Sequence, residues 1–269
     1  MKKIVVLLIA VFAMSGAAFT QDKAYVSLGA GVGIGTARTY DLCMTDYKVY
    51  PIGLGKGLGF NLRAGYFLGE NIAIELGVGY RMGLNTKVEI ELDDPEGVKS
   101  SHGTEVLKYK GNMLSLVPAI LISPNLDLGK VRPYARLGLL VGILPSIITK
   151  FDVTTSNYNS IGTLKYSGGV AFGGSFALGG DFNLSDLLAI YAEIYYDALS
   201  YAPSKGKFTK YEVGGKDMLP DMTTFEKEVE FVKDLTGFTP KDGEPDQQFK
   251  NSYPFNSLGL NIGVKIRFQ

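Results

Sequence analysis

The chain has 269 residues, with 27 basic and 27 acidic side chains and a formal net charge of zero. We expect no nucleic acid as a partner, because proteins that bind nucleic acids usually concentrate positive charge on one surface. A single cysteine, Cys43, excludes an internal disulfide framework, while the 34 glycines are well above the usual share of about 7% of residues.

The first residues have the layout of a secretory signal peptide. Two lysines precede an apolar run from Ile4 to Phe12, and small residues follow at 15–18. The run is shorter than the roughly 20 apolar residues that a membrane-spanning helix needs. We therefore expect residues 1–20 to direct export and to be removed, with cleavage after Ala18 or Thr20.

After this segment, apolar residues alternate with small or polar residues in eight segments, with the period of two that is typical of β-strands. Each segment has roughly 9 to 13 residues, which is the length that a tilted strand needs to cross a bilayer. In chain order the segments are 25–35, 58–66, 72–83, 113–122, 134–143, 169–182, 188–197 and 257–268.

The two faces of these segments differ in composition. In the last segment, Leu258, Leu260 and Ile262 alternate with Ser257 and Gly259. A soluble barrel of the lipocalin kind would expose the small residues to water, where Lys, Glu and Thr are usual. Small residues instead fit the narrow interior of an eight-stranded barrel, and large aliphatic residues fit lipid. Aromatic residues near strand ends fit interfacial girdles: Tyr25, Tyr66, Tyr80, Phe182, Tyr196 and Phe268.

The connections alternate in length. Three are short (67–71, 123–132 and 183–187), and four are long (36–57, 85–112, 145–165 and 200–255). Short periplasmic turns and long extracellular loops characterise transmembrane barrels. The pattern therefore predicts an all-β fold, an eight-stranded antiparallel up-and-down transmembrane β-barrel with long extracellular loops. Alternation in Thr86 to Leu92 and in Glu105 to Lys110 also predicts a hairpin above the membrane.

The long extracellular loop 200–255 contains a predicted short helix near residues 223–236. Thr223 and Glu226 have the spacing of a capping box, and Gly237 ends the helix. We expect this helix either to fold over the barrel mouth or to bind a partner, such as an extracellular ligand or an envelope protein. The apolar stripe that would contact a partner consists of Phe225, Val229, Val232 and Leu235.

Charged residues on the small-residue face form the candidate site of the lumen. A hairpin centred on Gly69 would place Arg63 opposite Glu75. Such pairs would either hold the lumen closed as a salt-bridged network or line an ion pathway. The predicted lumen charges are Arg63, Glu75, Arg81, Arg136, Asp181, Glu193, Asp197, Lys265 and Arg267.

The sequence predicts no catalytic residue, no cofactor and no metal site. His102 is the only histidine, and a lone histidine makes neither a metal site nor a catalytic triad. Ser100 and Ser101 lie beside it, but adjacency in sequence is not triad geometry. We expect that the protein is not an enzyme.

One hairpin has a recognisable sequence. The stretch MLSLVPAILISPNLDLGKVRPYARLGLLVGILP, residues 113–145, resembles the middle hairpin of the outer-membrane β-barrel domain family. Pro118 and PYARLGLLVG are its most specific parts. The family includes small barrels similar to OmpX, the OmpA membrane domain and PorT-like proteins, and this variant resembles those of the Bacteroidota.

The resemblance implies a location in the bacterial outer membrane, with residues 21–269 as one barrel domain in the lipid bilayer. It also implies insertion by the barrel-assembly machinery, guided by a last strand that ends in Phe268, here followed by Gln269. We expect a structural or interaction protein that acts in adhesion or envelope support through its extracellular loops. The alternative is a narrow pore for ions or small solutes, which crowding of the lumen by Tyr191 and Tyr195 disfavours.

Overall fold

The computed structural model describes residues 23–37, 39–42, 49–92, 103–124, 126, 128–155 and 158–268. The predicted signal segment, Cys43 and His102 lie outside the described residues. Strands make up most of the described chain. Among the described residues, no helix reaches the length and hydropathy needed to cross a bilayer.

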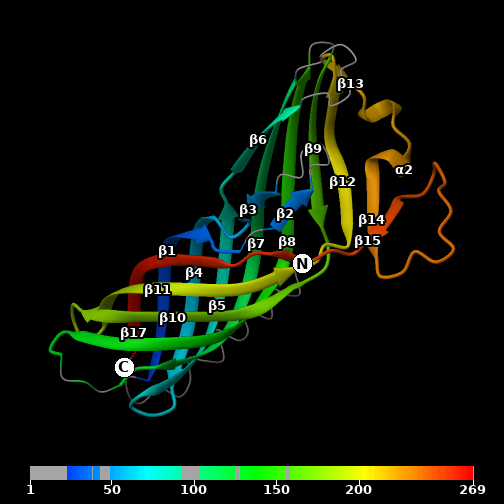
Figure 1. Ribbon diagram of the computed structural model, residues 1–269. Helices are drawn as coiled ribbons and strands as arrows, with labels where there is room; N and C mark the ends of the chain where they lie inside the picture. The colour runs from blue at the N-terminus through cyan, green and yellow to red at the C-terminus, as the bar shows by residue number, and fades with distance from the viewer. Residues whose placement is uncertain are drawn as a thin grey trace.

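Eight long strands close into a ring (Figure 1). Each pairs antiparallel with its neighbours in chain order, and the last strand pairs with the first from Ala24↔Phe268 to Gly35↔Ser257. The predicted eight-stranded antiparallel barrel is therefore confirmed. Its strands are β1 (Ala24–Gly35), β4 (Gly57–Phe67), β5 (Ile72–Gly83), β7 (Gly103–Ile122), β8 (Val131–Thr155), β10 (Ala171–Asn183), β11 (Leu188–Tyr201) and β17 (Ser257–Phe268).

The alternation of the sequence separates the two surfaces of the barrel. Large aliphatic side chains point outward, and Leu28, Leu260 and Ile262 are 59%, 58% and 61% exposed. Residues of the opposite parity point inward, as Ser27 and Lys265 do, and are buried. A broad aliphatic outer surface of this kind is suited to contact with lipid.

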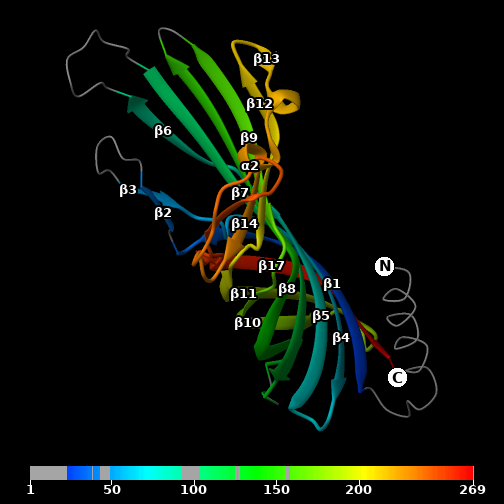
Figure 2. The same cartoon turned by 90° about the vertical axis from the view of Figure 1, so that its right-hand side faces the viewer.

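Two strands continue well beyond the barrel. β7 has 20 residues and β8 has 25, and their extensions pair from Gly103↔Thr155 to Asn112↔Ser146. Further strands add to both sides of this pair and form an open sheet, here called the projecting sheet (Figures 1 and 2). The added strands are β6 (Thr86–Leu92) on β7, then β9 (Asn159–Ser167), β12 (Lys205–Val213), β14 (Glu228–Val232) and β15 (Asp246–Phe249) on β8.

The pairing of β6 with β7 confirms the predicted hairpin above the barrel. Most of the segments 145–165 and 200–255, which were expected as loops, are instead strands of the projecting sheet or short elements next to it. The short elements of 200–255 are β13 (Lys216–Asp217), η2 (Leu219–Asp221), α2 (Thr224–Lys227) and β16 (Tyr253–Pro254), of which β16 pairs with β11. In the segment 36–57, β2 (Thr39–Leu42) and β3 (Val49–Ile52) pair with each other in a separate two-stranded sheet.

A β-bulge marks the point where the barrel continues into the projecting sheet. Gly111 of β7 pairs with Ile147 of β8, and Ser115 pairs with Gly142. These two pairs are four residues apart in β7 but five residues apart in β8, so β8 contains one extra residue. Leu144 lies in this bulge with a φ of 54°. One extra residue reverses the alternation of β8. The lumen side of the barrel therefore continues as the inner face of the projecting sheet, and the lipid side continues as its outer face.

The predicted helix at 223–236 is wrong in extent. Its capping box is present, but α2 is a single turn, and the sequence EVEFV that follows forms β14. This stretch alternates with period two, and it pairs with β12 and β15, so strand pairing replaces helical packing. The expected stripe of Phe225, Val229, Val232 and Leu235 does not form, because these residues belong to α2, β14 and the segment after it.

Candidate functional site

The nine predicted lumen charges come together inside the barrel. Five are basic and four are acidic, and each lies within 3.8 Å of an opposite charge. Eight of the nine side chains belong to buried residues, and Arg267 is half-buried. Buried charges are stable only when they are paired and hydrogen-bonded, and the lumen meets this condition with three groups of contacts along the barrel.

The central group is built on Glu193 of β11, whose side chain is 0% exposed. Its Oε1 accepts hydrogen bonds from Arg63 Nη2 and Arg136 Nη2, both at 2.7 Å, and from Asn261 Nδ2 at 2.9 Å. Its Oε2 accepts from the Tyr134 hydroxyl at 2.8 Å. Four side chains from three strands, β4, β8 and β17, therefore meet on one carboxylate of β11 and fill the cross-section of the barrel.

Glu75 lies beside this group. The Tyr25 hydroxyl donates to its Oε1 at 2.6 Å, and Arg136 Nε lies 3.8 Å from its Oε2. Tyr25, which was expected in an outer girdle, is in fact inside the lumen and only 1% exposed. It shares the parity of Ser27 and Gly29, which is the signal that assigns it to the inward face.

The predicted pairing of Arg63 with Glu75 is wrong. Arg63 lies opposite Gly77, and Glu75 lies opposite Gly65. The pairing of Phe67 with Ala73 centres the hairpin one residue after Gly69. Each residue of β4 therefore pairs with a residue of β5 that is two positions later than a hairpin centred on Gly69 would give. The Arg63 side chain instead crosses the lumen to Glu193.

A second group lies toward the end of the barrel that has the short turns. Asp181 Oδ2 accepts from Lys265 Nζ at 2.7 Å and from Arg267 Nη2 at 3.4 Å. The Lys265 ammonium also lies over the rings of Tyr25 and Tyr134, at 4.7 and 4.9 Å from their centroids. These cation–π contacts link the second group to the central one.

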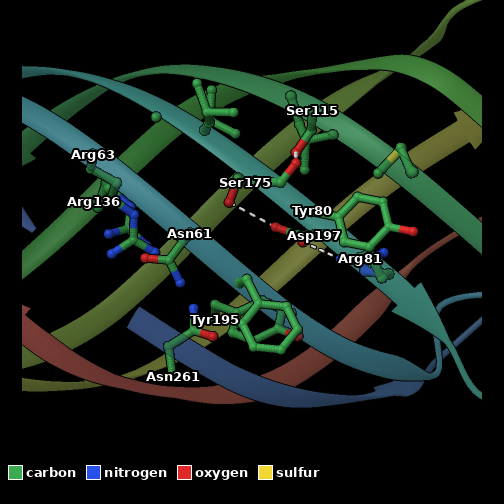
Figure 3. Close-up of a pocket in the computed structure, with 18 residues that line it drawn as sticks. Asn61, Arg63, Tyr80, Arg81, Ser115, Arg136, Ser175, Tyr195, Asp197 and Asn261 are labelled. Carbon is green, nitrogen blue, oxygen red and sulfur yellow. Dashed lines mark hydrogen bonds and ion pairs between the residues drawn. The ribbon is translucent and has the colours of Figure 1, made fainter. Parts of the chain in front are cut away.

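The third group lies toward the projecting sheet, because Arg81 and Asp197 are close to the ends of β5 and β11 that are away from the short turns. Figure 3 shows Asp197 between Ser175 and Arg81. Asp197 accepts from Arg81 Nη2 at 2.5 Å and from the Ser175 hydroxyl at 2.7 Å. Arg81 Nη1 also donates to the carbonyl oxygen of Phe255 at 3.1 Å. Arg81 therefore joins the charged lumen to the apolar residues above it.

These apolar residues form a plug at the same end of the barrel. The Phe255 and Tyr201 rings meet edge-on, with centroids 5.6 Å apart, and both side chains are 0% exposed. Leu54 and Leu199 belong to the same buried cluster. The plug residues that precede β4 and β17 were not predicted, because no alternation marks them in the sequence.

A small hollow remains between the central and third groups. Its volume is about 90 Å³, and its lining includes Asn61, Arg63, Ser175 and Asp197 (Figure 3). Since a water molecule occupies about 30 Å³ in the liquid, the space suits a few water molecules.

Glycines on the inward face make room for the tyrosine rings. A Cβ on Gly29 would lie 1.9 Å from the Tyr191 hydroxyl oxygen, and a Cβ on Gly65 would lie 2.2 Å from the Tyr25 ring. Any larger residue at these positions would displace a ring from the lumen. This packing accounts for part of the high glycine content.

Within the described ranges, no group of three or more His, Cys, Asp or Glu residues is arranged to hold a metal ion. The lumen is lined by paired charges and by hydroxyl groups such as those of Tyr25, Tyr134 and Ser175.

Comparison with known proteins gives one family. The model of the outer membrane protein beta-barrel domain matches residues 4–216. No curated protein matches the sequence.

Several solved structures are similar to the chain. Neisserial surface protein A is 13% identical over 91% of this chain and 97% of its own, with a TM-score of 0.38. Ail of Yersinia pestis is 13% identical over 91% and 99%, with a TM-score of 0.34. OprG of Pseudomonas aeruginosa is 12% identical over 93% and 97%, with a TM-score of 0.37.

Proposed function

The chain belongs to the outer membrane protein beta-barrel domain family, and from this premise we propose that it acts through its projecting sheet while its lumen stays closed. Residues 1–20 would direct export, and residues 21–269 would be inserted by the barrel-assembly machinery. The short-turn end would face the periplasm, which puts the projecting sheet outside the cell. The role would be that of a structural or interaction protein in adhesion or envelope support.

The filled lumen is the observation that supports this proposal. Charged groups span the lumen at three levels, and the apolar plug around Phe255 covers the end below the projecting sheet. An ion that crossed the barrel would have to break several buried ion pairs. Breaking each pair would leave a buried charge without its partner, which is energetically costly. The geometry therefore favours a closed barrel over the alternative of a narrow pore.

A conductance measurement separates these two functions. We expect the mature protein to give no single-channel steps in planar bilayers, because the paired charges and the plug fill the lumen. A heat-modifiable gel shift of the same sample establishes that it has folded. Reproducible steps whose size changes in Arg63→Ala, but not in the exposed control Lys210→Ala, would make the lumen the functional site and refute the proposal.

The outer face of the projecting sheet suggests what the sheet contacts. Lys87, Lys108 and Lys150 lie directly opposite one another on β6, β7 and β8, and Lys165 lies opposite Lys207 on the next strands. Like charges in register destabilise a strand pair. Among the described residues, Lys108, Lys150 and Lys165 have no ion-pair partner, so an anionic partner would relieve their repulsion.

The position of these lysines points to the outer leaflet as that partner. Lys110 lies on the same face as Leu114 and four residues before it in β7, toward the projecting sheet. The two residues are therefore about 13 Å apart at the usual rise of roughly 3.3 Å per residue. The lysines therefore follow directly on the lipid-facing surface, where phosphate groups of membrane glycolipids would lie. We propose that they hold the projecting sheet against this anionic layer.

Charge reversal tests this contact. In polyether detergent micelles, added lipid A is expected to raise the unfolding temperature of the wild type, since a ligand of the folded state stabilises it. Each lysine near an anionic surface contributes about 1 kcal/mol, so Lys108→Glu with Lys150→Glu is expected to weaken lipid A binding at least about tenfold. The matched control is Lys216→Glu with Lys241→Glu, which changes the same charge outside the outer face. An equal loss in the control would contradict a site on the outer face.

A further inference from the structure

The inner face of the projecting sheet carries a pocket that is separate from the lumen. The pocket has a volume of about 460 Å³ and combines three aromatic rings, two methionines and two carboxylates. α2 and the segment before it lie beside β12 and form its second wall (Figures 1 and 2). The lining residues are Phe151, Phe208, Tyr211, Met218, Met222, Asp221 and Glu226.

The three rings are mutual neighbours. The Phe151 centroid lies 6.3 Å from that of Phe208, with the ring planes at 89°, and 6.2 Å from that of Tyr211. The centroids of Phe208 and Tyr211 are 5.8 Å apart. All three residues are half-buried, so the rings are in contact with one another while the pocket that they line stays open.

A glycine in the strand between them allows the rings to approach. Phe151 of β8, Gly162 of β9 and Tyr211 of β12 are directly opposite one another. A Cβ on Gly162 would lie 2.1 Å from the Phe151 ring. The ring therefore lies across the backbone of β9, where only glycine leaves it room.

A β-bulge places the third ring on the same face. The register of β12 against β9 shifts between Phe208 and Lys210. Residues three apart in a regular strand point to opposite faces, but the extra residue Thr209 brings Phe208 and Tyr211 to the same face. Bulges often re-aim side chains at binding sites.

A backbone hydrogen bond holds one of the two carboxylates at the pocket, and a lysine side chain holds the other. The amide of Met218 donates to the Tyr211 carbonyl oxygen at 2.8 Å, which fixes the start of the second wall. In the capping box the Thr223 amide donates to Glu226 Oε2 at 2.7 Å. This bond holds the pKa of Glu226 below its ordinary value, so the carboxylate is charged at neutral pH. Asp221 lies 3.3 Å from Lys216 Nζ.

This chemistry selects an organic cation. The faces of aromatic rings carry negative charge density and attract cations, and aromatic cages recognise quaternary ammonium groups in this way. Methionine sulfur is polarisable and adapts to methyl groups, while the carboxylates complement a positive charge. We propose that the pocket binds a ligand with a quaternary ammonium group of the choline type.

Calorimetric titration of the full mature protein with choline tests the proposal. A polyether detergent supplies neither a quaternary ammonium group nor a sugar. The comparison ligand is 3,3-dimethyl-1-butanol, the neutral carbon isostere of choline. We expect choline to bind and the neutral isostere to bind at least tenfold more weakly, because the two ligands share their shape and differ in charge.

Three variants locate the site. Tyr211→Leu keeps an apolar wall but removes a ring, and it is expected to weaken choline binding at least fivefold. Gly162→Ala displaces the Phe151 ring without changing a lining residue and is expected to have a similar effect. Glu226→Gln retains the capping box and loses the charge, with an expected loss of about threefold. Tyr158→Leu, an exposed residue outside the pocket, is the control and is expected to bind choline like the wild type.

Three results would overturn the proposal. Equal affinity for choline and its isostere would show a simple apolar pocket. The absence of choline binding by wild-type protein that passes the gel-shift test for folding would show that the rings are only a packing cluster beneath the segment that carries α2. Competition between glucose and choline at the same site would show that the pocket binds a carbohydrate and not specifically an organic cation.

Discussion

Replacing Glu193 with alanine is expected to lower the free energy of unfolding by about 3–5 kcal/mol, the usual cost of breaking a buried ion pair. The substitution leaves the guanidinium groups of Arg63 and Arg136 without their shared carboxylate, and it removes the acceptor of Tyr134 and Asn261. Urea titration in micelles, followed by circular dichroism and gel mobility, measures the change. Tryptophan fluorescence is not applicable because the chain has no tryptophan.

Two further variants show whether the effect belongs to the buried network. Glu193→Gln keeps an acceptor oxygen and loses the charge, so its destabilisation is expected to lie between those of the wild type and the alanine variant. Glu228→Ala breaks an exposed pair with Lys207 and is expected to cost less than about 1 kcal/mol. If Glu193→Ala costs no more than Glu228→Ala, the lumen network does not hold the barrel together.

Placing a charge on the aliphatic outer surface is expected to impair insertion. Ile262 lies at the middle of β17 and is 61% exposed. An arginine near the bilayer midplane of a transmembrane barrel costs about 2–4 kcal/mol. Ile262→Arg is therefore expected to reduce the fraction of protein that folds into lipid vesicles, as measured by the heat-modifiable gel shift and by urea titration.

The matched control is Ile161→Arg on the outer face of the projecting sheet. Ile161 lies directly opposite Asp152 and Glu212, so a new arginine would have anionic neighbours and contact with water. We expect this variant to fold as the wild type does. Equal folding of Ile262→Arg and the wild type would show that the aliphatic surface of β17 does not face lipid.

The barrel strands could be predicted because their signal is local. The alternation in 72–83 and 257–268 gives the bounds of β5 and β17 as the structure has them. Parity along a strand also decides which residues face inward, which is why all nine lumen charges were found. Neither inference needs information about a distant part of the chain.

The partners of those charges depend on how the ring closes. Arg63 and Glu193 are 130 positions apart, and they meet because a long side chain crosses the lumen between β4 and β11. The local pattern suggested Glu75 instead, since cross-strand neighbours are the contacts that a hairpin implies. Side-chain length and the diameter of the barrel decide the contact, and neither appears in the alternation.

The projecting sheet was harder to predict for a related reason. The bulge at Thr209 interrupts the alternation of β12, and the outer face of the sheet is rich in lysine, which resembles a solvated loop. The capping box at Thr223 marks where a helix begins but not its length, so the sequence predicts a longer helix than the single turn that forms before β14. The aromatic pocket, which depends on the bulge, was missed with it.

The position of Phe255 along the chain has a consequence for assembly. Its amide donates to the Leu199 carbonyl oxygen at 2.8 Å, and it precedes β17 by two residues. β17 is also the strand whose pairing with β1 closes the ring. We therefore expect Phe255 to enter the plug when β17 pairs with β11. The plug would then form in the same step in which β17 pairs with β1 and closes the barrel. A barrel in which β1 and β17 are not yet paired would be open both between these strands and through its lumen. The pairing of β17 would close both openings together.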